Sequence, residues 1–147
     1  MKTIKVIYLV LLLISTSIFS QEKYNKFQDI KQIAQQENKN ILIKFSGSDW
    51  CIPCIKLQKK VIDDPRFQEF ISKNLVYVEA DFPRKKGKLT KELVARNKEL
   101  ADNYNQQGIF PKMVLLNTKG KILKTWEGFD KATAELLILE ISQSSGK

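Results

Sequence analysis

The chain has 147 residues, which is enough for one domain with a single core and too short for two. Hydrophobic residues make up 43% of it and charged residues 28%, with few glycines and prolines, so the composition excludes wholesale disorder. The formal charge is +9, but the basic residues are scattered apart from a cluster over 84–88, so we expect a solvated basic surface or a preference for acidic partners, and no nucleic-acid binding.

The N-terminus has the pattern of an export signal. Two lysines accompany an almost continuously apolar run over 4–14, and small polar residues follow it. We expect a signal peptide over 1–20, cleavage before Gln21 and a mature domain over 21–147. The apolar run is shorter than the roughly 20 residues of a spanning helix, and an uncleaved membrane anchor is the alternative. Export would place the mature chain in the periplasm or outside the cell, where disulfides persist.

The first half of the mature chain predicts alternating helices and strands. Apolar residues recur at helical spacing over 24–39, and the β-rich run ILIKF over 41–45 predicts a buried strand. A helix is expected to run on from Cys51. Asp64-Pro65 is typical of a helix start and predicts a further short helix. A second strand, LVYVEA, follows over 75–80.

The second half begins with a polar and basic loop over 82–89. Thr90 is a typical N-cap residue and begins a helix that reaches about residue 106. Two strands, 113–116 and 121–126, are joined by the turn sequence NTKG, and 131–142 predicts a final amphipathic helix.

This order of elements predicts an α/β fold. Strand, helix and strand come first, and a hairpin with a helix comes last, which implies a central mixed sheet with helices on both faces. The first two strands would be parallel neighbours.

The stretch SGSDWCIPC over 46–54 contains the chain's two cysteines. A zinc site would need four ligands. Cys51 and Cys54 could supply two of them, and the chain has no histidine for the others. A structural disulfide is the second interpretation. The loop between the cysteines is so short that closing it would contribute roughly 2 kcal/mol, against about 3 kcal/mol for fifteen residues.

The third interpretation is a redox couple. Two intervening residues let both sulfurs reach the same substrate sulfur in turn. If Cys51 begins a helix, free backbone N–H groups and the helix dipole favour its thiolate. Lowering its pKa from about 8.5 to about 7 would raise the thiolate fraction at neutral pH from a few per cent to about half. Cys51 is then the nucleophile and Cys54, one turn further and more buried, the resolving thiol.

Trp50-Cys51-Ile52-Pro53-Cys54, after a buried strand, resembles the W-C-x-P-C motif of the thioredoxin family. The run FSGSDWCIPCIKL is similar to exported thioredoxin-like proteins and to the periplasmic thioredoxin-like domain of membrane disulfide reductases. Asp81, the segment GIFP over 108–111 and the turn NTKG match further family positions. The resemblance covers about residue 41 to the C-terminus and implies a thioredoxin-like fold.

The resemblance also implies roles for single residues. Cys51 and Cys54 would form the redox-active disulfide, with Trp50, Pro53 and Asp49 supporting it. Pro111 would be a cis-proline opposite the motif, and the preceding Phe110 would contact substrate, with a simple core role as the alternative. No cofactor and no metal are implied. The substrates would be protein thiols and disulfides. The protein would act as a monomer.

A departure from the family pattern and the residues between the cysteines bear on mechanism. The family often buries an acid beneath the resolving cysteine, where this chain has Lys44 or Phe45. Another base must then accept the proton of Cys54, and Asp49, Glu79, Asp81 and water remain open. We expect Lys44 to point to solvent at the edge of the sheet. Oxidants and isomerases of this superfamily often carry His between the cysteines. Ile-Pro offers no such charge, which favours a reducing couple recharged by a membrane electron donor.

The leading hypothesis is therefore an exported thiol-disulfide oxidoreductase. A binding protein that retains the fold without cycling electrons is one alternative. A carrier that holds a soft metal such as Cu(I) between the two thiols is the other.

Overall fold

The computed structural model describes residues 25–146, and its centre is a four-stranded sheet with the order β2-β1-β3-β4. Strand β1 (Asn40–Ser46) pairs in parallel with β2 (Leu75–Asp81). On its other side β1 pairs antiparallel with β3 (Lys112–Leu116), which pairs antiparallel with β4 (Ile122–Glu127). The mixed sheet and its parallel first pair are therefore confirmed. The expected signal peptide over 1–20 lies outside the described residues.

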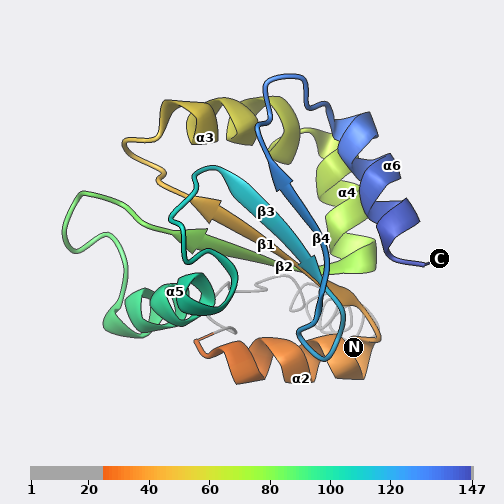
Figure 1. Ribbon diagram of the computed structural model, residues 1–147, viewed down its shortest axis with the longest axis horizontal. Coiled ribbons are helices and arrows are strands. Elements are labelled where there is room, and N and C mark those ends of the chain that lie inside the picture. Colours follow the sequence, from red (N-terminus) through yellow and green to blue (C-terminus); the bar gives the residue numbers. More distant parts are fainter. Residues whose placement is uncertain (1–24, 147) are drawn as a thin grey trace, which may run out of the picture.

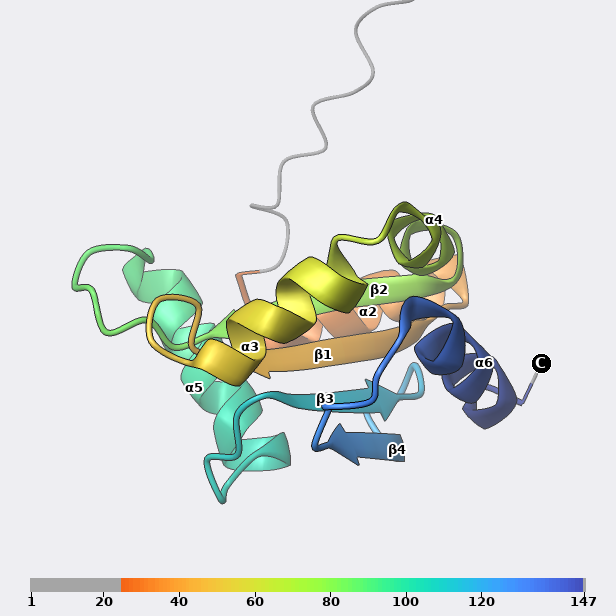
Figure 2. The ribbon, with the colours of Figure 1, turned by 90° about the horizontal axis from the view of Figure 1, so that it is seen from above.

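Helices cover both faces of this sheet, as predicted (Figures 1 and 2). Helices α2 (Phe27–Glu37) and α5 (Lys91–Tyr104) pack on one face. The other face carries α3 (Ile52–Leu57), the π-helical turn η2 (Gln58–Ile62), α4 (Pro65–Asn74) and α6 (Ala134–Ser144). Each face has its own buried apolar cluster, so the sheet is the shared wall between two halves of the core.

Strand β1 lies inside the sheet and is buried along almost its whole length. Successive side chains of a strand point to opposite faces. Ile41, Ile43 and Phe45 pack beneath α2 and α5, whereas Leu42 packs beneath α4 and α6. By the same alternation Lys44 shares the face of Leu42, the face that carries α3.

The predicted helix starts are confirmed by their caps. The Asp64 side chain accepts a hydrogen bond from the backbone N–H of Arg66 at the start of α4, and Pro65 occupies its first turn. The Thr90 hydroxyl likewise accepts from the N–H of Leu93 at the start of α5. These short-range signals need no tertiary context, because side chain and backbone partner lie within one turn.

The helix that begins after Cys51 differs from the regular helix predicted. Its second half widens into the π-helical turn η2 before Asp63 ends it. Single π turns of this kind occur inside α-helices, often beside functional sites. Gln58, the first residue of the wide turn, lies one turn beyond Cys54, and its side chain reaches the sheet. Within residues 25–146, no helix combines the length and apolar character needed to cross a bilayer.

Candidate active site

Cys51 and Cys54 form a disulfide at the start of α3, with their Cα atoms 5.2 Å apart. Cys51 is the N-cap residue, and its sulfur accepts a hydrogen bond from the backbone N–H of Cys54 at 3.3 Å. Pro53 lies in the first turn, where its missing N–H leaves no helical hydrogen bond unmade. The helix start thus directs the Cys54 N–H at the first sulfur, which favours a thiolate there once the disulfide is reduced.

The two sulfurs differ in exposure. Cys51 is 5% exposed and Cys54 1%, so the first cysteine is the one nearer the surface. Ile52, between them, is 66% exposed and marks the outer side of the turn. This asymmetry suits an attacking thiol followed by a buried resolving thiol.

Trp50 is held from three sides at the rim of the pair. Its indole Nε1 donates to the backbone carbonyl of Phe82 at 2.8 Å. The guanidinium of Arg84 lies over its ring at 4.6 Å, and the Phe110 ring meets it edge-on with centroids 5.7 Å apart. Gly47 makes room for the indole, because a Cβ there would lie 2.3 Å from the ring. The sequence interpretation had not singled out Gly47.

Asp49 holds the basic loop against the motif. Its carboxylate accepts the backbone N–H groups of Arg84 and Lys85, each at 2.9 Å. These two hydrogen bonds, the one from Lys85 first, lower the pKa of Asp49 below its usual range. Ser48 makes a similar link, because its N–H and hydroxyl both donate to the carboxylate of Asp81. Both acids therefore fasten loops around the motif.

The peptide bond between Phe110 and Pro111 is cis, as the resemblance implies. Phe110 is half-buried between Trp50 and Phe82, whose ring centroid is 5.5 Å away. Asn105 fixes the approach to this bond, because its buried side chain accepts from the N–H of Ile109 and donates to the carbonyl of the same residue. Asn105 was another residue that the sequence pattern did not reveal.

The expectation that Lys44 points to solvent is wrong. Its side chain is 1% exposed, because β1 is an inner strand and position 44 faces α3 rather than an open edge. Its Nζ lies 2.9 Å from a carboxylate oxygen of Glu79 on β2 and also donates to the side-chain oxygen of Gln58. Burying an ammonium group is costly unless it is paired, and these two partners compensate it.

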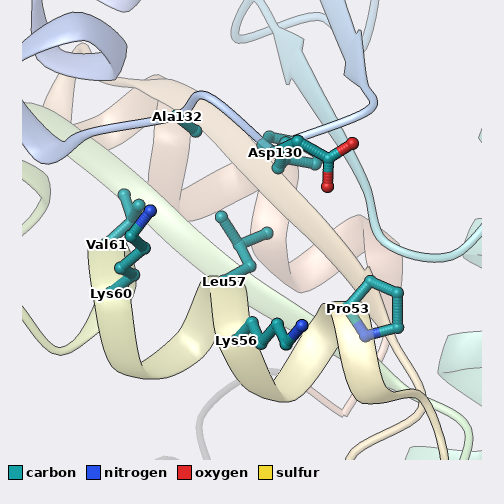
Figure 3. Close-up of a pocket in the computed structure, with 8 residues that line it drawn as sticks. Pro53, Lys56, Leu57, Lys60, Val61, Asp130 and Ala132 are labelled. Carbon is teal, nitrogen blue, oxygen red and sulfur yellow. The ribbon is translucent and has the colours of Figure 1, made fainter.

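A cavity of about 250 Å³ lies beside the redox pair, between α3 and the loop that follows β4 (Figure 3). Leu57 and Val61 form its apolar floor and Asp130 and Ala132 its far wall, with Pro53 closing the end next to the disulfide. Because Pro53 lies between the two cysteines in the sequence, this cavity is a second candidate surface for substrate, next to the rim residue Trp50 in the chain.

Comparisons with known proteins agree with this geometry. The profile of a family described as a thioredoxin-like domain matches residues 27–140. The disulfide bond reductase DsbH of Chlamydia pneumoniae is 34% identical over 101 residues, which is 69% of this chain and 60% of that protein. A shorter match, 34% identical over 56 residues, joins 38% of the chain to 16% of the thioredoxin-related protein DsbJ of the same organism.

Among solved structures, a DsbH oxidoreductase superimposes with a TM-score of 0.73 and 29% identity, over 81% of each chain. The C-terminal domain of DsbD from Neisseria meningitidis, in its oxidised form, gives a TM-score of 0.53 and 16% identity over 80% of this chain and 90% of that one. The second likeness shows the fold alone. The chain spans less than two thirds of the length of the curated relatives it matches.

Proposed function

The chain belongs to the thioredoxin-like domain family, and on that premise we propose that it is an exported thiol-disulfide oxidoreductase whose redox couple is Cys51 and Cys54. The observation that carries this proposal is the disulfide at the start of α3, with the Cys54 N–H directed at the Cys51 sulfur. Its likeness to a protein named disulfide bond reductase supports the same chemistry.

In the reduced protein the Cys51 thiolate attacks one sulfur of a substrate disulfide. A mixed disulfide forms, and the other substrate sulfur leaves as a thiolate. The Cys54 thiolate then attacks the Cys51 sulfur, which restores the Cys51–Cys54 disulfide and releases the second substrate thiolate. Two electrons pass from the protein to the substrate, so the protein must be reduced again before another turnover.

Trp50, Phe110 and Pro111 are proposed as the substrate contacts, and the cavity of Figure 3, which Pro53 lines, as a further contact surface. The two aromatic side chains are part-exposed at the rim beside the disulfide and pack on one another, so together they offer an apolar platform. Asp49 and Pro53 support the site by anchoring the adjacent loop and by starting the helix.

The proposed direction is reduction of protein disulfides. Ile52 and Pro53 place no charge between the sulfurs, and one relative is named a disulfide bond reductase. We further propose a signal peptide over 1–20, a working site in the periplasm or outside the cell, a monomeric state and a membrane electron donor. A protein that reduces disulfides in an oxidising compartment needs such a source of electrons.

Reduction of insulin by dithiothreitol tests the proposal, with wild type compared against Cys51→Ser. The wild type is expected to accelerate precipitation of the insulin B chain and the variant to leave it at the uncatalysed rate. Equal rates for wild type and Cys51→Ser would contradict the redox function and favour a binding protein that cycles no electrons. Equilibration with glutathione tests the direction, because a strongly oxidising potential would reverse it.

A further inference from the structure

Resolution of the mixed disulfide requires the Cys54 thiol to lose its proton. Cys54 is 1% exposed, so bulk water has almost no direct access to its sulfur. A nearby base must therefore receive the proton at the moment when Cys54 attacks. The question rests on the proposed function, and it concerns the second step of that reaction only.

Two of the nearby carboxylates are already engaged. Asp49 accepts the N–H groups of Arg84 and Lys85 in the outer loop. Both oxygens of Asp81 accept from Ser48, one from its N–H and one from its hydroxyl. Protonating either group would loosen a loop that shapes the rim of the site.

A cavity of about 300 Å³ has Cys54 in its wall together with Lys44, Gln58, Asp63 and Glu79. It is polar on the side of the sheet and large enough for several water molecules, each of which occupies about 30 Å³. Glu79 lies at the open side of it, with a side chain that is 39% exposed. The cavity thus has both Cys54 and a part-exposed carboxylate in its wall.

Glu79 is paired with the buried Lys44, which distinguishes it from the other charged and titratable groups around the cavity. Asp63 accepts a hydrogen bond from Gln58 at 2.7 Å, and Lys59 adds a second cation to the cavity wall. Arg96 on α5 donates to the backbone carbonyl of Glu79 at 2.8 Å. Tyr77, on the same face of β2, has a pKa raised well above its usual range by burial and then by Glu79 and Asp63, so it stays protonated.

We propose that Glu79 accepts the proton of Cys54 through this cavity, and that the buried Lys44 ammonium favours the Cys54 thiolate. Before the transfer Lys44 faces the Glu79 carboxylate, and afterwards it faces a protonated Glu79 and a Cys54 thiolate. The negative charge stays within the wall of the one cavity that Lys44 also lines, so no isolated charge is left in the interior.

Gln58 holds the Lys44 ammonium in place, and Lys44 acts as a positioning residue for this step. Cys54 and Gln58 lie four residues apart on one helical face, and the Gln58 side-chain oxygen accepts from the Lys44 Nζ. The same glutamine donates to Asp63. The amide therefore orients the ammonium beneath the helix turn that carries the sulfur.

Stopped-flow reaction of the reduced protein with dithiobis-nitrobenzoate tests both steps separately. The first nitrothiobenzoate is released when Cys51 attacks the reagent, and the second when Cys54 resolves the adduct. Glu79→Gln is expected to slow the second release by on the order of a hundredfold at neutral pH and to leave the first within about twofold. Lys44→Met is expected to move the pH profile of the second release upwards, which makes that release about tenfold slower at pH 7.

Glu127→Gln is the matched control, because Glu127 also pairs across two strands with a lysine, Lys112, at 3.2 Å and has a side chain 44% exposed. It should change neither release. A Glu79→Gln protein that resolves the adduct with the wild-type rate and pH profile overturns this inference. Absence of the first release from wild type would instead overturn the proposed function. Because Glu79 is part-exposed and glutamine has the same shape, the variant is expected to fold, and thermal unfolding verifies it.

Discussion

The ring of Phe110 meets the indole of Trp50 edge-on, with the centroids 5.7 Å apart. The residue before the redox motif's first cysteine thus touches the residue before Pro111, although sixty positions separate the two aromatic residues along the chain. This contact joins the end of the β1–α3 connection to the loop that leads into β3. The rim of the site is therefore one surface built from two distant segments.

Replacing Phe110 by Ala is expected to weaken substrate binding without stopping the chemistry. Loss of the edge-on contact and of the apolar platform should raise KM for insulin about fivefold, equivalent to about 1 kcal/mol, with kcat nearly unchanged. Phe70→Ala is a suitable control, because Phe70 is also half-buried and packs against another phenylalanine, Phe67, in the cluster on the other face. Both variants should lose about 2 kcal/mol of stability, but a KM change for Phe70→Ala as well would contradict a substrate contact at Phe110.

The Cys51 thiol is expected to titrate well below a free cysteine. The helix start and the backbone N–H of residue 54 stabilise its thiolate. Alkylation of the Cys54→Ser variant by iodoacetamide should therefore reach half its maximal rate at about pH 7. The same variant in denaturant is the control, and its alkylation rate should reach half its maximum at about pH 8.5. Identical midpoints in the folded and denatured protein would show that the fold does nothing to activate the sulfur.

Gly47→Ala is expected to disturb Trp50 specifically. The new Cβ would lie 2.3 Å from the indole ring, so the ring must move and its hydrogen bond to Phe82 must weaken. We expect a loss of about 2 kcal/mol of stability and a shift in Trp50 fluorescence, recorded in a Trp126→Phe background. Gly108→Ala introduces strain through its positive φ of 65° but has open space around it. That variant should leave the fluorescence of Trp50 as in wild type.

Asp49→Asn is expected to loosen the basic loop. The amide keeps one acceptor oxygen for two backbone N–H groups, so hydrogen exchange at Arg84 and Lys85 should accelerate severalfold. Because the pKa of Asp49 is lowered in the folded protein, protection of these amides should be complete above the usual carboxyl pKa and should be lost as the pH falls through the lowered value. Asp102→Asn, which breaks an exposed pair with Lys98, should leave both amides unaffected.

Features encoded within a few residues could be predicted from the sequence. Thr90 and Asp64 begin helices as expected because a cap requires only its own turn. The strand run ILIKF and the W-C-x-P-C motif likewise placed Cys51 at a strand-to-helix connection. The buried state of Lys44 escaped prediction because it depends on which strands flank β1, and that order is set by pairing with β2 and β3.

Some contacts between near neighbours also escaped prediction, because longer-range contacts decide them. The Trp50 indole occupies the space where a Gly47 side chain would be, and its hydrogen bond to the distant Phe82 holds it there. Asn105 could be interpreted only as the end of a helix until its amide was seen to bind Ile109. The choice of Glu79 among the three candidate acids needed the structure, because each of them is a plain acidic residue in the sequence.

Ile52 offers a position at which the protein can be re-engineered with little risk to its fold. Its side chain is 66% exposed between two sulfurs that are themselves enclosed. A library of substitutions there would vary charge and bulk within the electrostatic field of the couple while the scaffold stays constant. Such variants would calibrate how strongly one solvent-facing group can bias electron flow.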